Sequence, residues 1–118
     1  MLNGRKDLKH ILKKIDNHES LAGVDLRNLY LSCADFSGMQ LCRADLEGCR
    51  LNHALLMDCD LTDANLTNAN LSHASFNRAN LTGATLTNVV ADGASFEGAR
   101  GLTASSRKYL KSRGATGL

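Results

Sequence analysis

The side chains best suited to metal binding or nucleophilic chemistry are four cysteines and four histidines. The cysteines follow one another at spacings of 9, 7 and 10 residues, so the Cys-X-X-Cys pairs typical of zinc and thiol-exchange sites are missing. Cys33, His53 and His73 stand twenty residues apart, and a structure with that period would place them in one outward column. Both ligand types suit zinc or copper, but three ligands in a line do not enclose an ion tetrahedrally. Metal binding by this column is therefore a secondary hypothesis.

The sequence lacks the motifs that indicate catalysis. The sequence contains no Gly-X-Ser-X-Gly, His-Glu-X-X-His or Gly-X-Gly-X-X-Gly pattern and no phosphate-binding loop. Its carboxylates are spread singly along the chain, and catalysis needs polar groups that converge in a concave pocket. We expect no enzymatic activity and no cofactor.

Charge is distributed unevenly along the 118 residues. The net charge is +3 over residues 1–18, −5 over residues 19–100 and +4 over residues 101–118. Nucleic acid binding needs a continuous basic stripe, so direct binding is not expected. The longest apolar run, 54–57, is far shorter than the roughly 20 residues that span a bilayer, and no apolar signal segment is found at the start. These features predict no membrane partner and a cytoplasmic protein with reduced thiols.

An internal period of five residues dominates the sequence from residue 19 to 100. Apart from Glu19 at the edge, small or apolar residues stand two positions before each central residue, and Asp or Asn often lies between them. Five matches neither the 3.6 of a helix nor the 2.0 of a strand, so the chain must turn a corner in every unit. Fifteen of the sixteen central positions are Leu or Phe, with Ala91 as the exception, and we predict that these fifteen form the core: Leu21, Leu26, Leu31, Phe36, Leu41, Leu46, Leu51, Leu56, Leu61, Leu66, Leu71, Phe76, Leu81, Leu86 and Phe96.

These units resemble the pentapeptide-repeat family, whose A(D/N)LXX pattern is visible as AlaAspLeu at 44–46 and AlaAsnLeu at 64–66 and 79–81. The resemblance covers residues 19–100. It implies an all-β fold, a right-handed quadrilateral parallel β-helix of about four coils, with residues twenty apart stacked on each other. Cys49 and Cys59 would then point inward as core fillers.

The ends of such a solenoid need caps. Residues 1–18 include an apolar stripe at Leu8, Ile11, Leu12 and Ile15, which predicts a capping helix over about residues 4–17. In residues 101–118, Thr103 can begin a short helix that ends near Arg113. Family members use such a C-terminal helix as a cap or a dimer contact, so monomer and dimer both stay open. We expect residues 115–118 to be frayed.

Four outward positions carry apolar or aromatic residues where the pattern is otherwise polar: Tyr30, Leu55, Met57 and Val90. Met and Tyr are typical of interaction surfaces, whereas singly scattered exposed apolar residues are ordinary. We take these four as candidate partner-binding residues. The preferred function is a non-enzymatic scaffold or interaction module for a protein partner that the sequence does not identify.

A second function follows from the resemblance alone. Acidic family members mimic DNA and modulate DNA gyrase, and dense negative charge is what a DNA-binding cleft recognises. Two groups of acids would supply that charge here, and they are Asp25, Asp45 and Glu47, and Asp58, Asp60 and Asp63. The modest charge of the repeat, its basic ends and its missing loops make gyrase modulation the alternative.

Overall fold

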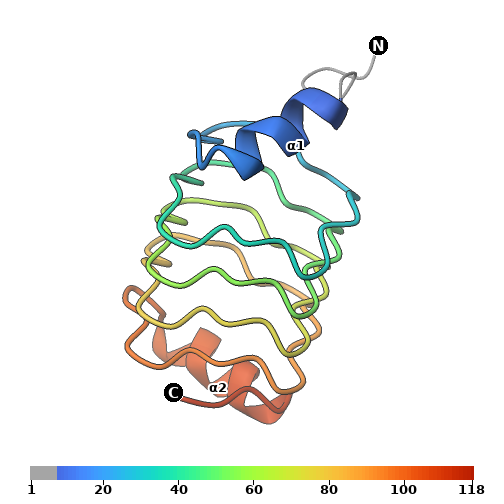
Figure 1. Ribbon diagram of the computed structural model, residues 1–118. Helices are drawn as coiled ribbons and strands as arrows, with labels where there is room; N and C mark the ends of the chain where they lie inside the picture. The colour runs from blue at the N-terminus through green and yellow to red at the C-terminus, as the bar shows by residue number, and fades with distance from the viewer. Residues whose placement is uncertain (1–7) are drawn as a thin grey trace.

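The structure is a computed structural model that describes residues 8–118. Two helices frame the repeat, α1 (Leu8–Asp16) and α2 (Ala104–Ser112). Between them the chain winds through a stack of similar coils, with α1 across one end and α2 across the other (Figure 1). Neither helix of the described part is long and apolar enough to cross a membrane.

The coils repeat every twenty residues and are joined by isolated parallel β-bridges. Bridges pair every fifth residue with the one twenty positions later, from Asp25 with Asp45 to Asn80 with Arg100. Longer strands, which an all-β fold would normally contain, are not found in residues 8–118. The reason is the short repeat: a two-residue corner in every unit of five leaves one bridging residue per edge.

The units turn their corners with the same backbone, although the turn at 86–89 lacks the closing hydrogen bond that the others have. The chain folds back through a β-turn, in which for example the Ala44 N–H donates to the Leu41 carbonyl at 3.1 Å. The second corner residue has a positive φ, between 59° and 74°, in all units from residue 23 to residue 98. A positive φ at the third residue of a hydrogen-bonded turn is the mark of type II.

The Asp or Asn before the central residue stabilises the next corner. Asp45 Oδ1 accepts from the Glu47 N–H at 3.2 Å, and Asn65 Oδ1 accepts from the Thr67 N–H at 3.1 Å. Asp and Asn are suited to this role because their short side chains reach the backbone two residues on. This hydrogen bond gives a physical reason for the acid or amide in the repeat.

The core is a column of stacked aliphatic and aromatic side chains inside the coils. All fifteen Leu and Phe residues of the central series are buried, and the most exposed, Leu86, reaches 7%. The rings of Phe76 and Phe96, one coil apart, stack with centroids 5.0 Å apart. Cys49 and Cys59 are buried with them, as expected from their inward positions.

α1 covers the first coil with only part of its apolar stripe. Ile11 and Ile15 are buried, whereas Leu8 and Leu12 are 46% and 44% exposed. The stripe is thus wider than the surface that it covers. The first residues of the helix expected over 4–17, up to residue 7, lie outside the described residues.

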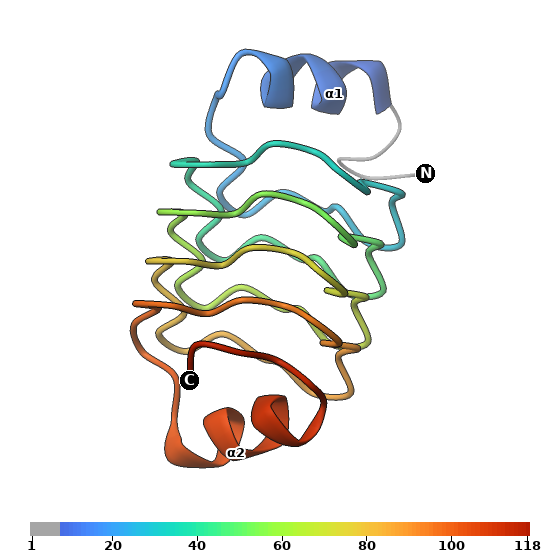
Figure 2. The ribbon, with the colours of Figure 1, turned by 60° about the horizontal axis from the view of Figure 1, so that its bottom comes forward.

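The C-terminal end is more ordered than the sequence suggests. Thr103 accepts a hydrogen bond from the Ser106 N–H at the start of α2, and Leu110 of α2 is buried. After α2 the chain returns to the stack, where Thr116 forms a parallel bridge with Ser95. Figure 2 shows this segment in dark red, lying beneath the last coil. Our expectation of a frayed tail over 115–118 is therefore wrong, because main-chain hydrogen bonds hold residues 115 and 116 and Leu118 packs against the core.

Candidate interaction surface

One corner of the stack carries a column that we call the histidine corner, made of Cys33, His53, His73 and Gly93. The imidazole rings of His53 and His73 stack, with centroids 5.1 Å apart and an interplanar angle of 16°. A Cβ atom at Gly93 would collide with the His73 ring, so glycine makes room for that ring. The structure thus brings together the column that the spacing of twenty predicts.

The histidine corner lacks the geometry of a metal centre. Within residues 8–118 no group of three or more His, Cys, Asp or Glu side chains is placed to hold an ion. The nitrogen lone pairs of an imidazole lie in the ring plane, so two stacked rings do not aim them at one point. The secondary hypothesis of zinc or copper binding gains no support from this arrangement.

Beside the histidine corner runs the tyrosine ladder, defined by the bridged residues Tyr30, Arg50, Asn70 and Val90. Tyr30 is 74% exposed, and the Arg50 guanidinium lies over its ring at 4.4 Å from the centroid. Val90 is also exposed, but Arg50 and Asn70 separate it from Tyr30. Tyr30 and Val90 therefore do not form a continuous apolar patch.

The other two candidate residues lie on the far side of the histidine corner. Leu55 is 40% exposed and bridges Asp35 and Ser75 in the neighbouring coils. Met57, at the following corner, is half-buried and so less accessible than Leu55. Of the four candidates, Tyr30, Leu55 and Val90 thus offer the more accessible contacts.

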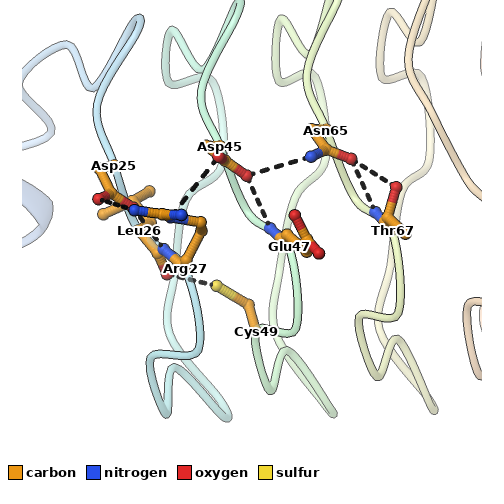
Figure 3. A network of polar contacts seen from close by, with 8 residues as sticks. All are labelled: Asp25, Leu26, Arg27, Asp45, Glu47, Cys49, Asn65 and Thr67. Atoms are coloured by element: carbon orange, nitrogen blue, oxygen red, sulfur yellow. Dashed lines mark hydrogen bonds and ion pairs between the residues drawn. The ribbon is translucent and has the colours of Figure 1, made fainter.

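The acidic ladder consists of Asp25, Asp45, Asn65 and Thr85, and its acids are largely compensated. Arg27 donates a hydrogen bond to each oxygen of Asp25, from Nε to Oδ1 at 2.9 Å and from Nη2 to Oδ2 at 3.0 Å. The same guanidinium lies 3.7 Å from Asp45, whose carboxylate also accepts from the Asn65 amide at 3.2 Å (Figure 3). The hydrogen bond to Asp25 raises the pKa of Arg27 above its usual value, so the guanidinium that contacts Asp25 and Asp45 stays charged.

The second acidic group is also partly neutralised. Arg78 makes two hydrogen bonds to Asp58 from one coil away, at 3.0 and 3.2 Å. Asp60 accepts from the hydroxyl and the N–H of Thr62, and these bonds lower its pKa. A surface that imitates DNA needs rows of uncompensated negative charge. The described acids do not form such rows, which disfavours the gyrase alternative.

The inward thiols are not nucleophiles. Cys49 and Cys59 donate to the main-chain carbonyls of Leu26 and Phe36 at 2.7 and 2.8 Å. Burial raises the pKa of Cys59 to about 12, so its thiol stays protonated. These contacts support the core-filling role that the sequence predicts for both.

Sequence analysis overlooked one catalytic-type spacing, a Ser-X-X-Lys run formed by Ser105 and Lys108 on α2. Both residues are exposed. A lysine that activates a serine lies in a desolvated pocket, whereas Lys108 is exposed on the helix surface. The spacing therefore reflects the composition of a solvent-exposed helix.

Comparison with known proteins identifies the repeat. The family model for pentapeptide repeats matches residues 20–58 and 59–98, with eight copies. A search of the curated proteins finds no match. A pentapeptide repeat protein from the Arabidopsis thaliana thylakoid lumen is 31% identical, with a TM-score of 0.66, covering 83% of this chain and 79% of that one. The cytoplasmic location expected from the sequence stays a prediction.

More distant structures share the fold. A pentapeptide repeat protein from Nostoc PCC 7120 is 22% identical, with a TM-score of 0.53, covering 92% of this chain and 94% of that one. The plasmid-mediated fluoroquinolone resistance protein QnrB1 is 20% identical with a TM-score of 0.42, covering 72% and 59%, which is too distant to carry an argument. Structures of pentapeptide repeat proteins are right-handed quadrilateral β-helices, the fold class that the sequence predicts. With its period of five, its twenty-residue coils and this family match, the chain belongs to the pentapeptide-repeat family.

Proposed function

We propose that the protein is a non-enzymatic interaction module, a rigid β-helical rod of four coils that binds a protein partner through one side. That side consists of the histidine corner, the tyrosine ladder and Leu55. The observation that carries the proposal is the retention of Cys33, His53 and His73 at backbone positions where their φ angles are +65°, +63° and +59°.

Side chains at such positions are unfavourable for folding. A left-handed backbone costs a residue with a Cβ about 1–2 kcal/mol; Gly, Asn and Asp adopt it most readily, and His is also enriched there. Strained residues that persist in a structure are concentrated at functional sites. The fold would accept glycine in this column, as it does at Gly93. A role in recognition accounts for three side chains that folding does not require.

The neighbouring tyrosine ladder supplies the residue types that dominate binding energy at interfaces. Tyr and Arg are enriched among hot spots, and a rigid scaffold lowers the entropy lost on binding. The stacking of Arg50 on Tyr30 holds both side chains in place before a partner arrives. Leu55 adds an exposed aliphatic contact in the next unit of the same coil.

We also propose that the rod acts as a monomer. α2 buries Leu110 against the stack, and most of its other residues, including Arg107, Lys108 and Lys111, are exposed and polar. A helix with this surface caps the apolar cross-section without offering an apolar face to a second copy. Sedimentation at rising concentration checks this, with a single species as the expected result.

The experiment that tests the binding side is affinity capture from a lysate of the source cells, analysed by mass spectrometry. We expect a stoichiometric partner with the native chain, and its loss with Tyr30→Ala or Leu55→Asp. Gln40→Asp is the matched control, because Gln40 is an exposed bridging residue on another face of the rod.

Affinities measured with the captured partner then quantify the effect. Tyr30→Ala should weaken binding by about 2 kcal/mol, roughly thirtyfold, if Tyr30 is a hot spot. Equal binding by all variants would place the contact elsewhere on the rod. The absence of any stoichiometric partner would contradict the interaction role itself.

A further inference from the structure

The last rung of the acidic ladder, residues 84–88, has an open main-chain edge. In the preceding coils the central residue donates its N–H to the next coil, as Leu46 does to the Asn65 carbonyl at 2.7 Å. Leu86 and Asn88 occupy the equivalent donor positions in the last coil. Within residues 8–118 their N–H groups have no main-chain acceptor, and the Ala84 carbonyl has no main-chain donor. The next coil is interrupted here because the chain forms α2.

Other parts of the same end are paired. The N–H groups of Gly93 and Phe96 donate to Gly114 and Thr116 at 3.0 and 2.9 Å. The Tyr109 hydroxyl donates to the Val89 carbonyl at 3.2 Å. The C-terminal segment and α2 therefore pair several groups of the neighbouring edges, although the Gly83 and Ala91 N–H groups also have no main-chain acceptor within residues 8–118, and they leave the edge at 84–88 available.

A groove runs beside this open edge, between the last rung and the start of α2. Its volume is about 250 Å³. Leu86 at its base is 7% exposed, whereas Leu26, Leu46 and Leu66 in the same column are fully buried. A cavity of about 150 Å³ already accommodates a benzene ring, so this groove has room for an aliphatic side chain. The groove is lined by Leu86, Thr87, Asn88, Ser105, Ser106 and Tyr109.

The charge around the groove selects the sign of a ligand. Its lining is uncharged, but the segment 101–118 that forms one wall carries four basic residues and no acidic one. Arg107 and Lys108, which follow the groove serines on α2, are both exposed. An acidic segment is therefore the complementary partner for this end of the rod.

We propose that the edge at residues 84–88 binds an extended acidic peptide segment of a partner protein, which adds one parallel rung to the ladder. This goes beyond the binding side proposed above, because the edge lies at the end of the rod and recognises backbone. The chain's own unit, AlaAspLeuGlu at 44–47, shows the sequence that makes such a rung on this face. In a matching peptide, alanine and leucine would face Ala84 and Leu86.

The register of the ladder fixes the hydrogen bonds. Within the rod, Asp45 donates its N–H to Val24 and accepts from Leu26, and Glu47 accepts from Asn28. By analogy the peptide aspartate donates to the Ala84 carbonyl and accepts from the Leu86 N–H. The carbonyl of the glutamate after leucine accepts from the Asn88 N–H. The N–H of the peptide leucine points away from the rod and makes no bond.

This asymmetry allows a test on the peptide. The probe is a fluorescein-labelled nine-residue peptide built on the order of residues 44–48, with glutamates at both ends, titrated with the full chain and followed by anisotropy. N-methylation of its aspartate should weaken binding by about tenfold or more, because the Ala84 carbonyl loses its donor. N-methylation of its leucine is the control and should change binding less than about twofold.

A variant pair tests the groove from the protein side. Ser105→Trp fills the groove and should abolish peptide binding, whereas Ser112→Trp on the same helix should not, since Ser112 is exposed outside the groove. Thermal unfolding verifies that both variants are folded. Equal effects of the two N-methyl groups, or no binding at about 1 mM peptide, would overturn the proposal.

The remaining occupant is a second copy of the chain. A concentration-dependent dimer that Ser105→Trp abolishes would assign the edge to self-association and overturn the peptide proposal. Retention of Tyr30-dependent partner capture by Ser105→Trp would show that the side surface works independently, so failure here leaves the proposed function intact.

Discussion

Two corner columns of the rod have the same backbone and different residues. The asparagine corner (Asn28, Gly48, Asn68 and Asn88) has φ angles from 59° to 70°, and the histidine corner has nearly the same range, 59° to 71°. Gly and Asn adopt this conformation most readily, His does so less often, and Cys seldom does. Backbone preference therefore accounts for every residue of the asparagine corner and for Gly93 of the histidine corner, whereas Cys33, His53 and His73 are less favoured there, as Arg43 and Arg78 are in the other two corners.

The surroundings of the two corners differ in the same sense. Beside the asparagine corner, the acids of the acidic ladder bond to Arg27 and to the next coil (Figure 3). The tyrosine ladder with the exposed Tyr30 lies between the two corners, and on the far side of the histidine corner Leu55 is exposed. One side of the rod satisfies its polar groups internally, and the other presents groups that a partner can use.

The largest expected effect concerns the core that both corners share. Leu66→Ala, beneath the asparagine corner, and Leu71→Ala, beneath the histidine corner, should each lower the free energy of unfolding by about 2–5 kcal/mol, because both leucines are fully buried. Urea unfolding measures both. A loss below about 1 kcal/mol for Leu71→Ala alone would contradict the prediction. It would show that the core beneath the histidine corner is packed more loosely than the core beneath the asparagine corner.

The second prediction concerns the glycine that makes room for a histidine. Gly23→Ala adds only backbone strain, about 1–2 kcal/mol, because nothing lies within 4 Å of the new Cβ. Gly93→Ala should cost about 1 kcal/mol more, since its Cβ meets the His73 ring. Thermal and urea unfolding compare the pair. Equal losses would show that His73 moves aside freely, contrary to a fixed ring stack.

The third prediction is a substitution that should stabilise the fold, unlike the two above. Cys33→Gly should stabilise the fold by about 0.5–1 kcal/mol, because it removes left-handed strain at a modest entropic loss. Asn68→Gly in the asparagine corner should change stability by less than about 0.5 kcal/mol. Chemical unfolding gives both values. If Cys33→Gly destabilises the protein, strain is not what distinguishes the two corners.

The smallest effect is a pH dependence that should be alike on both sides of the rod. Hydrogen bonds from Ser37 and Thr62 lower the pKa values of Asp35 and Asp60 below 3.8. Their stabilising contribution is therefore complete above that value and is lost as the pH falls through the folded pKa. Asn keeps the acceptor and does not titrate, so Asp35→Asn and Asp60→Asn should each flatten the loss of stability between about pH 4 and pH 2. Unfolding midpoints across this range measure it, and a steeper acid limb in either variant would contradict the assignment.

Most of the fold could be predicted because it follows from a sequence pattern that repeats every five residues. The central Leu and Phe positions, the corner glycines and asparagines, and the capping role of Asp and Asn all repeat every five residues. The return of the chain at Thr116 could not be predicted in this way. It pairs with Ser95 at an offset of 21, because α2 interrupts the count of twenty.

The candidate surface was less accessible to sequence reasoning. The ion pair between Arg78 and Asp58 had a usable signal, since the two residues stand twenty apart in one corner column. The clamp of Arg27 across two coils depends on the path of a long side chain, which no spacing reveals. The open edge at residues 84–88 follows from where α2 begins, so it emerged only from the structure.

The coil of twenty residues also sets a rule for insertions and deletions. Adding or removing twenty residues within the repeat would keep every ladder in register and change the rod's length by about 4.8 Å, the spacing between neighbouring strands. Adding five would rotate everything downstream by a quarter turn, so that Tyr30 would no longer stand above Arg50. Duplication of whole coils therefore changes only the length of the rod. An insertion or deletion of any other size changes which residues stand above one another on the lateral surfaces.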